Sequence, residues 1–108
     1  MANTFKNAHS VSVGTAYVTT YAAPSATTTV VLGMTLCNKT TGSITADVQF
    51  RDSATTAVKM LTSVDIPAGS TLEILAGQKY ILETTDDIQV KSSVAASMDV
   101  VMGVMEIT

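Results

Sequence analysis

The stretch from Ile66 to Thr108, IPAGSTLEILAGQKYILETTDDIQVKSSVAASMDVVMGVMEIT, decides the fold class of this chain. It consists of short runs of apolar and β-branched residues, separated by clusters of Pro, Gly, Ser, Thr and Asp. Runs of this length between turn residues are typical of β-strands. The stretch therefore predicts four strands, at residues 71–76, 79–83, 88–92 and 98–107.

The preceding part of the chain continues this pattern. Apolar and polar residues alternate from Ile44 to Arg51, as in a strand with one face in a core. Further strand-like runs cover 11–21, 27–38 and 57–64, and no run has helical periodicity beyond one turn. About eight strands at this spacing predict an all-β fold, a single antiparallel β-sandwich of the jelly-roll or immunoglobulin-like kind. We expect 28–38 and 44–51 to pair as an antiparallel hairpin.

A chain of 108 residues is long enough for one domain. Residues 1–10 have no periodicity and predict an irregular N-terminal arm, so the expected division is an arm at 1–10 and a sandwich at 11–108. The first residues are polar and do not resemble a signal peptide, and no apolar run approaches the ~20 residues of a membrane-spanning helix.

Charged residues make up only 14% of the chain, whereas soluble proteins carry about 25%. Thr and Ser take the place of the missing charges. A surface with so few charges is poorly protected against association, which indicates that a partner covers part of it. The alternative is a Thr- and Ser-rich secreted domain that stays soluble through its hydroxyl groups.

The composition also disfavours several function classes. The net charge is −3, the six cationic residues are scattered, and there is no Trp, so the chain has no basic or stacking surface for nucleic acid. The single cysteine, Cys37, excludes an internal disulfide and a cysteine-based zinc site, and we expect it to be half-buried in a strand. The lack of disulfides fits assembly in a reducing cytoplasm.

No group of residues predicts catalysis or a cofactor. His9 is the only histidine, and no nucleophile motif accompanies it. The adjacent carboxylates Asp86 and Asp87 could bind Ca²⁺ with further ligands, but a turn is the better interpretation because Asp bonds nearby backbone groups. We therefore expect no enzyme activity, no metal and no cofactor.

The last strand, 98–107, is apolar on both faces apart from Asp99 and Glu106. Such a strand needs cover on both sides, either as a central strand of the sandwich or from a neighbouring subunit. Its methionines are candidates for a plastic contact surface. The residues that we predict to form an interface, from this strand and from the N-terminal arm, are Phe5, Lys6, His9, Met98, Met102 and Met105.

Several segments together resemble one protein family. They are the opening MANTFKNA at 1–8, the break APSATTT at 23–29, IPAGS at 66–70, LET at 82–84 with VKSS at 90–93, and the ending MEIT at 105–108. Across nearly the whole chain this sequence resembles the short virion structural proteins of tailed bacteriophages, especially those of marine bacteria and cyanobacteria. The likeness is one of overall pattern, and it carries no catalytic or ligand-binding motif.

The resemblance implies a β-sandwich built into a phage particle, whose partners are other copies of itself and other virion proteins. We expect a capsid decoration or cement protein that is assembled in the host cytoplasm and stabilises the particle by protein–protein contact. A neck or tail accessory subunit is the first alternative. A module that binds carbohydrate or the host surface is the second, although its aromatic residues are few and dispersed along the chain.

Overall fold

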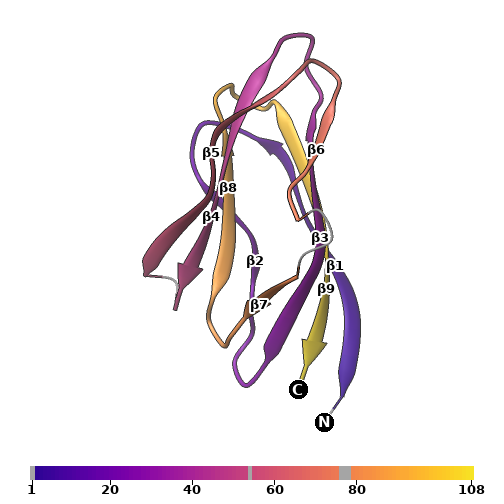
Figure 1. The fold of residues 1–108 in the computed structure, drawn as a ribbon, viewed down its shortest axis with the longest axis vertical. Helices are drawn as coiled ribbons and strands as arrows, with labels where there is room; N and C mark the ends of the chain where they lie inside the picture. The colour runs from indigo at the N-terminus through magenta and orange to yellow at the C-terminus, as the bar shows by residue number, and fades with distance from the viewer. Residues whose placement is uncertain (1, 54, 76–78) are drawn as a thin grey trace.

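The computed structural model describes residues 2–53, 55–75 and 79–108, which form nine β-strands in two antiparallel sheets (Figure 1). The all-β sandwich predicted from the sequence is confirmed, with nine strands in place of about eight. The strands are β1 (Asn3–Val13), β2 (Val18–Ala22), β3 (Thr28–Asn38), β4 (Ile44–Asp52), β5 (Thr56–Ile66), β6 (Thr71–Glu73), β7 (Tyr80–Leu82), β8 (Asp87–Ser92) and β9 (Met98–Ile107).

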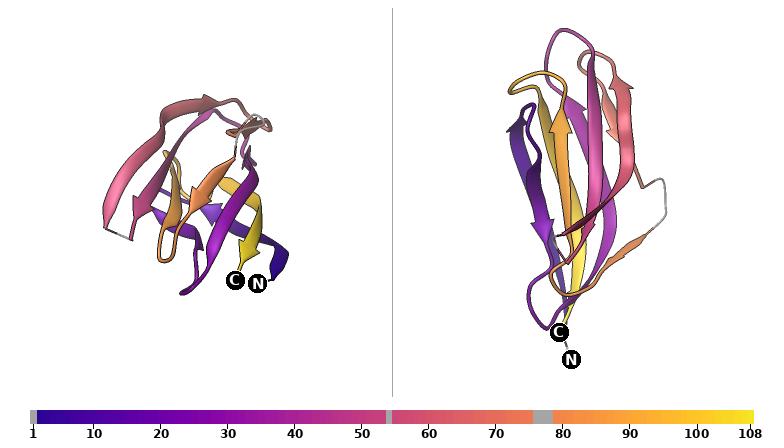
Figure 2. Two further views of the ribbon diagram at one scale, coloured as in Figure 1. Left: turned by 60° about the horizontal axis from the view of Figure 1, so that its bottom comes forward. Right: turned by 90° about the vertical axis from the view of Figure 1, so that its left-hand side faces the viewer.

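The two sheets are called sheet A and sheet B below. Sheet A has the order β1-β9-β3-β6, and β7 also pairs with β3; sheet B has the order β2-β8-β4-β5. The last strand, β9, therefore lies between β1 and β3, which confirms a central position for it. The two chain ends lie side by side at one end of the sandwich, where Ala2 and Thr108 exchange two backbone hydrogen bonds (Figures 1 and 2).

The core lies between the sheets and is made by alternate residues of their central strands, because successive side chains of a strand point to opposite faces. In β4 the alternation seen in the sequence buries Ile44, Ala46 and Val48. The largest buried side chains of the core are those of Met34, Leu36, Ile44, Ile66, Leu82, Ile88, Met98 and Met102.

The hairpin expected from 28–38 and 44–51 is wrong. β3 belongs to sheet A and pairs with β9, β6 and β7, whereas β4 belongs to sheet B and pairs with β5 and β8. The turn at 39–43 therefore crosses from one sheet to the other. Both strands have a strongly apolar face, and packing these faces across the core buries them better than pairing edge to edge would.

The N-terminal region also differs from the expectation. Residues 3–10, expected to be irregular, are β-strand: they form most of β1 and pair with β9. The single strand expected at 11–21 is divided, because Val13 ends β1 in sheet A and Val18 begins β2 in sheet B. Gly14 lies at this crossing between the sheets.

A bulge in β3 changes which residues face the core, compared with simple alternation along the strand. The register of β3 against β9 shifts between Val31 and Gly33. Before the shift Val31 faces the core, and after it Met34 does so, while Leu32 between them is exposed. Val30, Leu32 and Met34 alternate in the sequence as if they shared one face, but only Met34 is buried in the core.

Candidate contact surface

The outer face of sheet A carries a row of apolar side chains that crosses four strands. The register places Phe5 of β1 opposite Met105 of β9, Met105 opposite Val30 of β3, and Val30 opposite Ile81 of β7. Residues directly opposite one another on paired strands share a face. Phe5 is 72% exposed and Ile81 is 54% exposed, whereas the two side chains between them are half-buried. We call these four residues the apolar row.

A shallow hollow lies beside the apolar row. Gly103 of β9 is opposite Asn7 and Gly33, and an added Cβ would meet nothing within 4 Å at either glycine. The hollow is about 250 Å³ and is bordered by Val101, which is 52% exposed. The missing side chains thus leave space on this face for groups of another molecule.

At the end of β9 where Asp99 lies, charged groups border the apolar part of this face. Asp99 accepts a hydrogen bond from the Ser12 backbone amide at 2.8 Å and pairs with Lys39 at 3.0 Å. The Ser12 amide, followed by the Lys39 ammonium, lowers the pKa of Asp99 below its ordinary value. This end therefore forms a polar border to the apolar surface.

The outer face of sheet B is polar and bonded to itself. Gln89 of β8 donates to Thr19 of β2 at 3.0 Å, Gln49 of β4 donates to Gln89 at 2.8 Å, and Lys59 of β5 donates to Gln49 at 2.8 Å. These four side chains cross all four strands of sheet B, and we call them the polar row. Their hydrogen-bonding groups pair with one another, so this face needs no partner to satisfy them.

Two further contacts strengthen the outer face of sheet B. Arg51 binds the Asp87 carboxylate through two hydrogen bonds, of 2.9 and 2.6 Å, and this pairing raises the pKa of Arg51. The ammonium groups of Lys59 and Lys91 each lie 4.8 Å from the centre of the Tyr17 ring, within the range of a cation–π interaction.

A polar bridge joins the two sheets on the side where β1 and β2 lie. The Tyr21 hydroxyl of β2 donates to Glu106 of β9 at 2.6 Å, and Lys6 of β1 pairs with the same carboxylate at 3.0 Å. Burial and the bond to Glu106 raise the pKa of Tyr21 to about 12, and the bonds from Tyr21 and Lys6 lower the pKa of Glu106. The bridge is therefore built for a neutral tyrosine and an ionised glutamate.

The six residues predicted to form an interface lie in three different places. Phe5 and Met105 are direct neighbours in the apolar row, and His9 lies opposite Val101 on the same face. Lys6 lies on the opposite side of β1 and belongs to the polar bridge. Met98 and Met102 are 0% and 1% exposed, so both are core residues that offer no surface to another molecule in this conformation.

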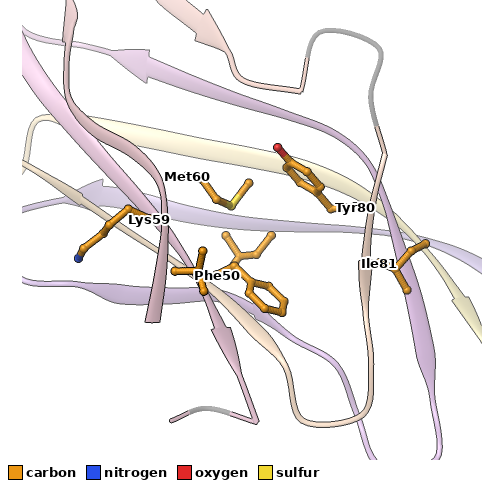
Figure 3. Close-up of a pocket in the computed structure, with 7 residues that line it drawn as sticks. Phe50, Lys59, Met60, Tyr80 and Ile81 are labelled. Carbon is orange, nitrogen blue, oxygen red and sulfur yellow. The ribbon is translucent and has the colours of Figure 1, made fainter. Parts of the chain in front are cut away.

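An open hollow of about 400 Å³ lies between the edge strands β5 and β7. Figure 3 shows Met60 and Tyr80 turned into the hollow, while Lys59 and Ile81 point away from it. Phe50 also lines it, so the fold brings together two aromatic residues that are distant in the sequence. Its lining is mainly apolar, and the charged residue that borders it, Lys59, bonds to Gln49 of the polar row.

The adjacent carboxylates have structural partners, as a turn requires. Asp86 accepts hydrogen bonds from the backbone amides of Ser53 and Glu83, both at 2.9 Å, and Asp87 binds Arg51. Within the described ranges, no group of three or more His, Cys, Asp or Glu side chains could hold a metal ion. Cys37 is half-buried in β3, as expected.

Asn38, the last residue of β3, has a structural role. The Asn38 side chain is fully buried and donates to the carbonyl groups of Gly42, Ile66 and Pro67. It thereby ties the turn after β3 to the end of β5. The part of the chain that the structure describes contains no helix long and apolar enough to cross a membrane.

Comparison of the sequence with protein-family models and with curated proteins finds no match. Among solved structures, the chain is similar to a subunit from work describing Bacillus endospore appendages as a family of disulfide-linked pili, with a TM-score of 0.60 and 12% identity over 99% of this chain and 87% of that one. A chain from infectious bursal disease virus, Gx strain, matches at a TM-score of 0.48 and 11% identity, over 96% of this chain and 28% of that one. The first likeness establishes a shared β-sandwich fold, and the second carries no argument.

Proposed function

We propose that this protein is a non-enzymatic structural subunit of a tailed bacteriophage particle, and that it decorates the capsid by docking the outer face of sheet A onto the coat protein. The observation that carries the proposal is the apolar row from Phe5 to Ile81, beside the hollow at Gly103. An exposed apolar surface with a polar border is typical of a protein–protein contact.

Three further facts support an assembled subunit. Charges are scarce, one solved structure with a similar fold comes from pili, and the sequence resembles phage virion proteins over nearly the whole chain. On a capsid, such a subunit would bridge neighbouring coat proteins and resist the pressure of packaged DNA. Assembly would take place in the host cytoplasm, without a cofactor.

The decisive experiment is a particle map of the phage that encodes this chain, combined with quantitative mass spectrometry of purified particles. A decoration protein occupies a lattice position repeated over the whole head, with the outer face of sheet A against the coat protein. A single ring at one vertex identifies the alternative, a neck or tail accessory subunit. Absence of the chain from purified particles contradicts both.

A second candidate function is binding of carbohydrate or of a host surface. The hollow that brings Phe50 and Tyr80 together favours it, because sugars stack on aromatic side chains. A glycan screen with the natural chain and with Tyr80→Ala tests this candidate. Binding that is lost in Tyr80→Ala supports it, and no binding by the natural chain excludes it for the glycans screened.

A further inference from the structure

β1 is the edge strand best suited to pair with another chain. From Asn3 to Ser10 its register against β9 runs without interruption, and no other described strand pairs with its far side. Unpaired backbone groups on a long regular edge are a template for an additional strand. The first shift in this register comes only between Ser10 and Val13.

The other edges carry the features by which proteins prevent such pairing. β5 has the same length as β1, but its register against β4 shifts twice, and Ser63 has a positive φ of 50° with its amide bonded to Asp47. β2 has five residues and a shift, whereas β6 and β7 have three residues each. Bulges and short strands protect an edge. β1 has such a bulge at Ser12, where φ is 55° and the amide is bonded to Asp99, but residues 3–10 before it have none.

The one lysine on the regular part of the β1 edge is held in an ion pair within its own chain, which weakens its protection of the edge. A lysine on an edge strand usually repels a second copy. Here the Lys6 ammonium binds the Glu106 carboxylate at 3.0 Å, and that carboxylate is held by Tyr21. The remaining side chains from Asn3 to Ser10 include no carboxylate and no other lysine or arginine.

We infer that two copies of this chain pair through β1, antiparallel, about a two-fold axis that passes beside Asn7. The regular segment 3–10 has its midpoint between Lys6 and Asn7, and an axis at Lys6 would set two ammonium groups opposite each other. An axis at Asn7 sets Lys6 opposite the partner copy's Ala8 position. It also sets Phe5 opposite the partner copy's His9 position, an aromatic cross-strand pair.

This arrangement goes beyond the proposed function, because it specifies how the protein associates with itself. A two-fold axis perpendicular to the sheet leaves both outer faces on the same side. The two apolar rows then lie on the same side of the pair, offset by four residues or about 14 Å along the strands. Each row ends at Phe5 against His9 of the other copy.

Charge exchange at Asn7 tests the pairing in solution, with no particle present. Asn7→Lys and Asn7→Asp each place like charges across the axis, and each variant alone should dissociate about 100-fold more readily than the natural chain. An equal mixture of the two should pair again. The matched control is Asn3→Lys, on the same face of the same strand but away from the axis, which should pair normally. Analytical ultracentrifugation reads the mass.

A cross-link provides a second, independent test in a Cys37→Ser background. Residues opposite each other have Cα atoms about 4.5–5.5 Å apart, within disulfide range, so Asn7→Cys should form a linked dimer on mild oxidation. Asn3→Cys should not, because its two copies would be about 27 Å apart at ~3.4 Å per residue. A monomeric natural chain, unchanged pairing of each charged variant, or equal linking at both positions overturns the inference. Any of these results leaves the proposed docking of sheet A intact.

Discussion

The two outer faces of this sandwich differ in chemistry: one is apolar and the other is polar. Each has a row of side chains that crosses four strands, but the apolar row of sheet A contains no polar group, and the polar row of sheet B bonds to itself from Thr19 to Lys59. The hydrogen-bonding groups in the polar row of sheet B are therefore satisfied without a partner. Sheet A leaves Phe5 and Ile81 exposed, which costs free energy until a partner covers them.

Association and folding therefore depend on different parts of the molecule. Docking is expected to depend on the outer face of sheet A, and the stability of the isolated chain on the core and on the bridge between the sheets. Substitutions on the outer face and in the bridge should therefore change docking and stability separately.

A charge on the apolar face should abolish docking. Val101→Lys puts an ammonium group in the contact, where burying it without a partner costs about 3 kcal/mol or roughly 100-fold in affinity. Thr19→Lys, an exposed strand position in the polar row of sheet B, is the matched control and should dock within about twofold of the natural chain. Co-sedimentation with particles that lack the protein measures both. Equal losses for the two variants would remove the distinction between the faces.

The bridge between the sheets should control stability alone. Tyr21→Phe removes the hydroxyl that donates to the buried Glu106 carboxylate, which should lower the free energy of unfolding by about 2 kcal/mol. Urea unfolding followed by circular dichroism measures the change. Docking at a temperature where the variant is folded should be unaffected, and a docking defect there would place the bridge in the contact.

Filling the hollow of sheet A should weaken docking without harming the fold. Gly103→Val adds a β-branched side chain at a position where a Cβ meets nothing within 4 Å, so the strand should be as stable as before or slightly more so. The added methyl groups should occupy space that the coat protein needs and weaken docking about tenfold, or ~1.4 kcal/mol. Gly42→Val, in an exposed turn with equal space, is the control.

The smallest expected effect is a loss of stability in acid. The pKa of Glu106 is lowered in the folded chain, so folding favours the ionised carboxylate. Its contribution is fully present above the ordinary value of 4.5 and is lost as the pH falls through the lowered pKa of the folded state. Unfolding midpoints measured from pH 6 to pH 2 should fall, and Glu106→Gln should flatten part of the decline. An unchanged slope in that variant would assign the acid sensitivity to other groups, Asp99 among them.

The sequence predicts the parts of this fold that depend on local periodicity. The alternation from Ile44 to Phe50 identifies β4 and its buried face, and Pro67 to Ser70 forms the expected turn, with Gly69 at a φ of 66°. Sheet membership is a long-range property, and for that reason the hairpin expected between β3 and β4 was wrong.

The candidate site depends on register, which no local pattern contains. Phe5 and Met105 were both predicted as contact residues, but their being neighbours in a row with Val30 follows only from the pairing of β1, β9 and β3. Met98 and Met102 illustrate the converse. Both are methionines of the same strand as Met105, but the alternation of side chains along β9 places them in the core.

The polar row was missed altogether, because Gln and Thr are unremarkable one at a time. Gln49 and Gln89 lie 40 positions apart and become partners only when β4 pairs with β8. The signal that could have indicated them is the polar set of alternate positions in two strands that each have an apolar opposite face.

Hydroxyl-radical footprinting of the free and the particle-bound protein identifies the face that docks. It measures the reactivity of single side chains on both outer faces in one experiment. Docking through sheet A predicts strong protection of Phe5, Met105 and Ile81 on binding, with Tyr17 and Lys59, on the sheet B side of the molecule, as reactive as in the free chain. Protection of the sheet B residues, with Phe5 and Ile81 still reactive, would contradict it.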